Sequence, residues 1–151
     1  MATRYFALIA GIVYVLAGLL GFLPGAVHDP VTGDPDVGVV GGWGYLIGLF
    51  PVNFLHNLVH LALGAWGLMA YRDFMAARGY ARGLTIIYGV LAVMGVIPGL
   101  RTVFGLVPIF GNDIWLHAVT AVVAAYFGWG RAEEVPVSTT ATSPETPTDQ
   151  P

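Results

Sequence analysis

Long apolar runs separated by short polar segments dominate the pattern of this chain. Four runs are almost free of charged residues, and they cover about residues 5–23, 51–71, 83–100 and 113–130. Each approaches the roughly 20 residues that a helix needs to cross a bilayer. No run alternates apolar and polar positions as barrel strands do, and a spanning segment must pair its own backbone polar groups. The pattern therefore predicts four transmembrane helices and an all-α integral membrane fold.

The arginines lie unevenly about these runs. Five of the six occur before the first run, between the second and third, or after the fourth: Arg4, Arg72, Arg78, Arg82 and Arg131. Because basic residues concentrate in cytoplasmic loops, this asymmetry predicts that both termini are cytoplasmic. The sixth, Arg101, then lies outside, as does the long first outer loop that contains His28. We expect a multi-pass protein of the bacterial inner membrane.

Composition agrees with a protein whose solvent is lipid. Hydrophobic residues make up 56% of the chain and charged residues only 10%, against about 25% charged in soluble proteins. A net charge of -3 offers no basic surface for nucleic acid. The chain has no cysteine, which excludes disulfides, thiolate nucleophiles and iron–sulfur clusters. The bilayer is the expected partner, and a homo-oligomer or a membrane protein partner is left open.

The sequence divides into two parts. Residues 1–131 are predicted to form one transmembrane domain. Residues 132–151 are rich in Pro, Ser and Thr and contain two glutamates, Glu133 and Glu134, near their start. Such a segment cannot bury a core, so we expect a disordered cytoplasmic tail.

The first and third runs resemble each other in sequence. The segment from Tyr14 to Gly25 aligns with that from Tyr88 to Gly99 without a gap, and Tyr, Gly, Pro and Gly coincide. The second and fourth runs align more weakly, with His56 on His117, once the first outer loop is allowed 13 extra residues. We interpret this as a duplicated helical hairpin. The two copies should form an antiparallel bundle with a pseudo-twofold axis along the membrane normal.

Three histidines fall inside the spans. His56 and His60 are four residues apart and therefore share one helical face, and His117 lies on a helix that enters from the same outer side. Small and polar residues recur on these faces at spacings of three and four, which is typical of packing faces in membrane bundles. The histidines should therefore converge in the outer half of the bundle. Four further polar residues are expected to complete this polar core: Asn53, Tyr14, Tyr88 and Asp113.

This polar core has several interpretations that the sequence leaves open. The groups could hydrogen-bond one another and hold the helices together, at about 0.6 kcal/mol per contact. They could bind a transition metal through His56, His60 and His117, with Asp113 or Asn53 as an outer acceptor. Haem ligation by two histidines, or a pathway for protons or a small solute, are the remaining alternatives.

An enzyme is not indicated by these residues. The H-x-x-x-H spacing lacks the glutamate of a zinc protease. We therefore expect a structural, accessory or binding component of the membrane, with an unknown cofactor if it has one.

One segment resembles a known family. The run from Pro51 to Leu61, with its N-x-x-H-x-x-x-H pattern at Asn53, His56 and His60, is similar to the bacterial membrane family catalogued as domain of unknown function 4383. A late Leu116-His117 matches a looser part of that signature, and the resemblance covers about residues 5–130. It implies a four-span membrane protein without an established activity, and it adds no substrate.

Overall fold

The computed structural model describes residues 1–130; the predicted tail, residues 132–151, lies outside them. Within this part the chain forms four helices: α1 (Ala2–Leu20), α2 (Phe54–Ala70), α3 (Phe74–Val96) and α4 (Asn112–Trp129). A short 3-10 helix, η1 (Pro98–Leu100), follows α3. The fold is therefore mostly helical, as the apolar runs predicted.

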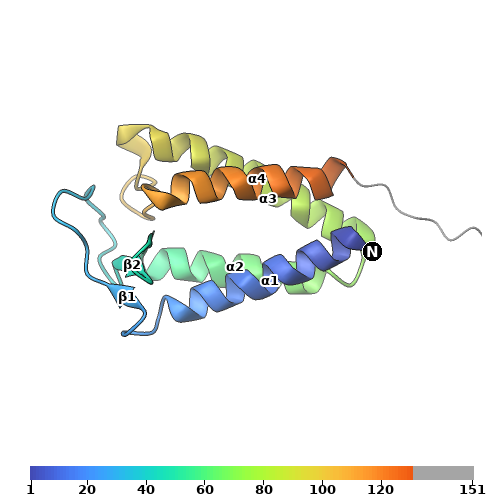
Figure 1. The fold of residues 1–151 in the computed structure, drawn as a ribbon, viewed down its shortest axis with the longest axis horizontal. Helices are drawn as coiled ribbons and strands as arrows, with labels where there is room; N and C mark the ends of the chain where they lie inside the picture. The colour runs from blue at the N-terminus through green and yellow to red at the C-terminus, as the bar shows by residue number, and fades with distance from the viewer. Residues whose placement is uncertain (131–151) are drawn as a thin grey trace, which may run out of the picture.

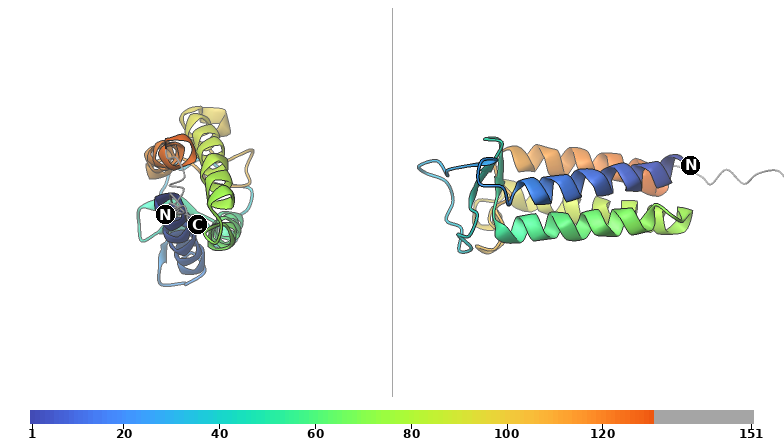
Figure 2. Two further views of the ribbon diagram at one scale, coloured as in Figure 1. Left: turned by 90° about the vertical axis from the view of Figure 1, so that its right-hand side faces the viewer. Right: turned by 90° about the horizontal axis from the view of Figure 1, so that it is seen from below.

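The helices run up and down as two hairpins that lie side by side. Figure 1 shows α1 beside α2 and α3 beside α4, and the views of Figure 2 agree. The long loop between α1 and α2 and the loop 97–111 lie at one end, which we call the sheet end. The amino terminus and the α2–α3 turn lie at the opposite end, which we call the N-terminal end. Each hairpin therefore begins at the N-terminal end and turns at the sheet end.

Two of the helices are long and apolar enough to cross a membrane by length and composition. These are α1, with 19 residues, and α3, with 23. The second helix is also apolar but has 17 residues. The structure thus contains two candidate spans by this criterion, where the sequence pattern predicted four.

The start of α2 differs from the prediction. We expected Pro51 in the first helical turn, but it lies in a strand, and the helix begins at Phe54. The reason is the side chain of Asn53, which accepts a hydrogen bond from the His56 N–H and caps the helix. Asn residues favour this position because the side chain replaces a missing intrahelical partner.

The start of α3 also differs. It begins at Phe74, not near residue 83, because the Asp73 carboxylate accepts from the Ala76 N–H and caps the helix there. Arg78 and Arg82, which we placed in a loop, are therefore helical. The apolar run begins after the last charged residue, whereas the helix itself begins earlier. The predicted start of this helix was therefore too late.

A small antiparallel sheet was not predicted. It comprises β1 (Val27–His28), β2 (Gly44–Leu46) and β3 (Phe50–Val52), in the order β1-β2-β3. Tyr45 of β2 pairs with Pro51 and donates its hydroxyl to Asp34 at 2.7 Å. Burial and this carboxylate raise the pKa of the Tyr45 hydroxyl, so it remains a donor. The sheet gives the long loop a fixed shape over the end of the bundle.

Close backbone contact holds the α1–α2 hairpin together. A Cβ atom on Gly11 would lie 2.8 Å from the Leu68 nitrogen, and one on Gly64 would lie 2.7 Å from the Val15 nitrogen. Where lipid replaces water, such small-residue contacts are the usual basis of helix association. The buried core that these contacts enclose includes Ala7, Leu63, Tyr80, Leu84, Tyr88 and Ala124.

Gly11→Ala should destabilise the protein, whereas Gly89→Ala should not. Both glycines are helical, so each alanine gains helix propensity of up to about 1 kcal/mol. At Gly11 the new methyl group meets the backbone of α2, while nothing lies within 4 Å of a Cβ at Gly89. We expect Gly11→Ala to cost about 1–3 kcal/mol through overpacking. Thermal unfolding in detergent measures both, and equal midpoints would contradict this packing.

Candidate metal centre

Three buried side chains converge at the sheet end of the bundle. His56 of α2 and Asp113 and His117 of α4 each offer one ligand atom, and these atoms all lie within 4.8 Å of one another. The exposed fractions are 4% for His56, 2% for Asp113 and 3% for His117. An ion between them would therefore be shielded from solvent by the protein.

The position of His56 depends on Asn53. Besides capping α2, the Asn53 Nδ2 donates to the Val39 carbonyl at 3.0 Å and to the Leu106 carbonyl at 2.8 Å. These two carbonyls belong to the two loops at the sheet end. One amide therefore joins both loops to the first turn of α2, where His56 lies.

The opposite wall comes from the start of α4. Gly111, with φ of 61°, precedes the helix in a conformation that glycine adopts without strain. Asn112 then donates its Nδ2 to the Leu49 carbonyl at 3.0 Å and attaches α4 to the long loop. Asp113 and His117 are four residues apart, so both face α2 from one side of α4.

One polar atom of each of these three side chains lacks a hydrogen-bond partner among residues 1–130. His56 Nδ1 and Asp113 Oδ2 are 4.0 Å apart, which is too long for a hydrogen bond. These two atoms and His117 Nδ1 are buried, and none has a hydrogen-bond partner among residues 1–130. A buried polar atom without a partner costs roughly 1–3 kcal/mol. A bound cation would remove this cost for all three side chains.

The spacing is close to that of a metal site. Nitrogen and oxygen ligands stand about 2.0–2.2 Å from zinc, so ligand atoms on one ion are at most roughly 4 Å apart. The His56–Asp113 pair meets this limit at 4.0 Å. The widest separation lies within 4.8 Å, slightly beyond this limit.

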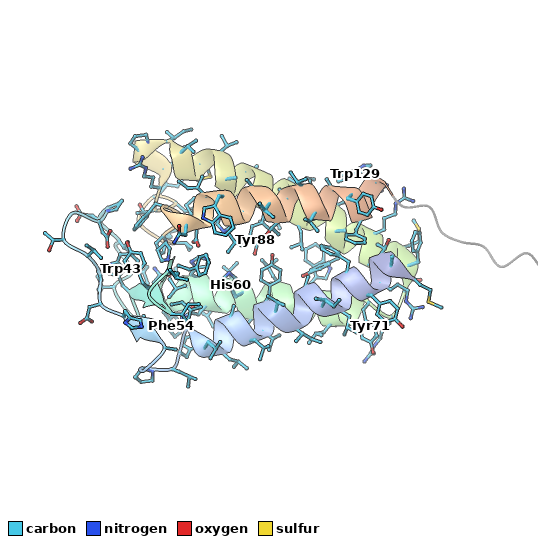
Figure 3. The ribbon with its side chains drawn as sticks, viewed as in Figure 1. Trp43, Phe54, His60, Tyr71, Tyr88 and Trp129 are labelled. Atoms are coloured by element: carbon cyan, nitrogen blue, oxygen red, sulfur yellow. The ribbon has the colours of Figure 1, made fainter. Side chains whose placement is uncertain are left out.

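His60, Tyr14 and Tyr88 lie beneath this group. The His60 ring centroid is 4.5 Å from that of His56 and 5.7 Å from that of Tyr14. Tyr14 stacks on Tyr88 at 5.7 Å with 9° between the planes, and Tyr88 lies 4.9 Å from His117. Figure 3 shows His60 and Tyr88 pointing into the space between the two hairpins. Five rings thus run from His56 around to His117.

The predicted polar core is only partly a ligand group. The ligand atoms that lie within 4.8 Å of one another come from His56, His117 and Asp113, which we had assigned to an outer role; His60 is outside this group, and the set His56, His60 and His117 stays a prediction. Asn53 is a cap and a loop anchor. Asn57 was not among the expected polar residues, yet it is fully buried and donates its Nδ2 to the Gly21 carbonyl at 2.7 Å. In the sequence, Asn57 is marked only by its place four residues after Asn53 and directly after His56.

Comparison with known proteins identifies the family. The model of the family described as Domain of unknown function (DUF4383) matches residues 4–130. The chain belongs to this family. No curated protein and no solved structure is matched. The DUF4383 match covers α2, α3, α4 and α1 from Arg4 onward, so the buried group of His56, Asp113 and His117 lies within the family domain.

Two imidazoles and one carboxylate define the chemistry that this DUF4383 chain can offer. This set suits zinc and other divalent first-row metals, and it leaves coordination positions open. Softer metals that require thiolate are disfavoured because the chain has no cysteine. The residues thus fit a borderline divalent cation.

Asn53→Ala and Asp73→Ala form a matched pair, since each removes one helix cap. Loss of a cap costs about 1 kcal/mol. Asn53→Ala also deprives the Val39 and Leu106 carbonyls of a donor, so we expect it to cost at least about 1 kcal/mol more than Asp73→Ala. Thermal unfolding compares the two. Equal losses would mean that the Asn53 contacts to the loops contribute nothing.

Proposed function

We propose that this protein is a four-span membrane protein that binds one divalent transition-metal ion at His56, Asp113 and His117. The observation that carries the proposal is the convergence of three buried ligand atoms without hydrogen-bond partners among the described residues. The metal would supply a Lewis-acid or redox centre inside the bundle, with at least one coordination position left for a small ligand.

Helix length supports a membrane placement for all four helices. At 1.5 Å per residue, even α2 with 17 residues reaches about 26 Å, near the roughly 30 Å hydrocarbon core. Large apolar side chains on three helices are more than half exposed: Ile9, Leu16, Ile86, Val93 and Val122. Soluble monomers rarely expose so much apolar surface. We place the N-terminal end in the cytoplasm on the strength of the arginine distribution.

A bound ion accounts for the site better than direct pairing of its side chains. If His56 and Asp113 served only to join the helices, they should meet at hydrogen-bond distance, and they do not. A haem is a weaker fit because its porphyrin already fills four positions around the iron, and a third protein ligand has no place there. The carboxylate therefore favours a bare ion.

The core below the site argues against a proton or solute pathway. A proton or solute route to the N-terminal end would pass Tyr14 and Tyr88. Beyond these tyrosines, Ala7, Leu84 and Ala124 are fully buried and apolar. A continuous wet path would have to displace this packing.

The duplicated hairpin is part of the proposal. Positions 74 residues apart have related roles: Tyr14 stacks on Tyr88, as expected for equivalent residues near a twofold axis. Arg4 donates to the Tyr71 carbonyl at the end of α2, and Arg78 donates to the Gly128 carbonyl at the end of α4. His56 and His117 would then be equivalent ligands, one from each hairpin.

Metal analysis of the detergent-purified protein tests the site. We expect about one ion per chain after loading with Zn²⁺ or Fe²⁺, and at least about 100-fold weaker binding in Asp113→Asn and His117→Phe, which remove ligands. His60→Phe should bind within about tenfold of the parent, since His60 only supports the group. His28→Phe, on exposed β1, is the matched control.

Two results would count against this assignment. If His60→Phe lost the ion and Asp113→Asn kept it, the three-histidine set would be the site instead. If the parent protein bound no ion under any loading condition, the group would be structural.

Cysteine labelling tests the orientation. Thr32 lies in the exposed part of the long loop, and Met75 is 62% exposed near the start of α3. In intact cells a membrane-impermeant thiol reagent should label Thr32→Cys, while Met75→Cys should react only after permeabilisation. The chain has no native cysteine to interfere. Labelling of Met75→Cys alone in intact cells would reverse the orientation.

A further inference from the structure

Two arginines of α3 converge on one backbone oxygen at the N-terminal end. Arg78 and Arg82 each donate the Nε–H to the Gly128 carbonyl, both at 2.9 Å. A backbone carbonyl has two lone pairs, so it can accept from both side chains as a C-terminal cap. The cost of this arrangement is that two like charges are held at the same oxygen.

The faces of both guanidinium groups are covered by aromatic rings. The Arg82 Cζ lies 5.2 Å from the ring centroid of Trp129, and the Arg78 Cζ lies 6.0 Å from that of Phe74. With Nε bonded and one face on a ring, each group keeps only its terminal NH₂ edge for another partner. That edge is the part of arginine that binds carboxylate or phosphate oxygens as a fork.

No carboxylate among residues 1–130 forms an ion pair with either arginine. The nearest acidic residue in sequence, Asp73, uses its carboxylate to cap α3. Two adjacent guanidinium groups repel each other, so the arrangement would be stabilised by an anion that accepts from both edges. Glycine at position 128 permits the close approach of the Arg82 side chain, because a Cβ there would lie 2.9 Å from the Arg82 Cγ.

The pair lies where lipid headgroups are expected. Trp129 is 53% exposed, and Figure 3 places it at the N-terminal end with Tyr71. Exposed tryptophan beside arginine is typical of the membrane interface, and the cytoplasmic leaflet carries anionic lipids. An isolated phosphate would have no reason to lie beside an exposed apolar ring.

We propose that Arg78 and Arg82 bind the phosphate of an anionic phospholipid, with phosphatidylglycerol as the probe. The proposal rests on the membrane placement given above but not on the metal site. If the lipid proposal fails, the metal assignment is unaffected, because metal content alone tests that assignment.

Native mass spectrometry of the full-length protein in detergent provides the test. The parent should retain phosphatidylglycerol in preference to phosphatidylcholine. The double variant Arg78→Lys, Arg82→Lys keeps both charges but loses the planar forks, so its affinity for phosphatidylglycerol should fall at least about tenfold. Arg72→Lys, a matched change at an exposed arginine on the same end, should leave it unchanged within about twofold. Each single lysine variant should show part of the loss, and thermal unfolding in detergent verifies that every variant is folded.

Three outcomes would overturn the proposal. Equal retention of phosphatidylglycerol by the parent and the double lysine variant would mean that charge alone attracts lipid. If inorganic phosphate at equal concentration displaced the lipid, Arg78 and Arg82 would form a site for free phosphate. If Glu133→Gln, Glu134→Gln gained a lipid preference that the parent lacked, carboxylates of the chain itself would be the occupants.

Discussion

The side-chain amide of Asn53 is the contact on which the sheet end depends. It satisfies three backbone groups at once: the His56 N–H and the Val39 and Leu106 carbonyls. The Leu106 carbonyl lies in the loop that leads into α4, so this amide fixes the start of one helix against the approach to another. The separation between His56 and the ligand candidates on α4 follows from that constraint. An apolar residue at this position would leave these two partly buried carbonyls without this donor and the two loops unlinked.

The remainder of the bundle is held by a different kind of interaction. Along α1 and α2, contact between glycine backbones replaces side-chain interdigitation, as at Gly11 and Gly64. At the N-terminal end, arginine side chains satisfy the last carbonyls of α2 and α4. Polar groups thus pair at both ends while the middle packs through small and apolar residues. This division suits a helix pair whose middle is surrounded by lipid.

The sequence predicted those features that arise within a single helix. Apolar runs located the helices, and the four-residue spacing of His56 and His60 placed both on an inner face. It failed where tertiary contacts decide. Pro51 suits a first helical turn as well as an edge strand, and only pairing with Tyr45 assigns it to β3. Asp113 was expected in the polar core, and it is buried, but its approach to His56 and His117 depends on contacts between α2 and α4 that a sequence pattern does not contain. The first two turns of α3 were not predicted because they contain Arg78 and Arg82. A hydropathy pattern cannot show that both side chains bond to the Gly128 carbonyl.

The distribution of the candidate ligands connects the site to assembly. His56 belongs to the first hairpin, while Asp113 and His117 belong to the second. Neither hairpin alone brings all three side chains together, so an ion at this point would bind only after the hairpins associate. Binding free energy would then add directly to the stability of the assembled bundle. The stacked Tyr14–Tyr88 pair, which also joins the hairpins, holds them together without an ion. The three ligand atoms can therefore lie within 4.8 Å of one another without an ion to hold them.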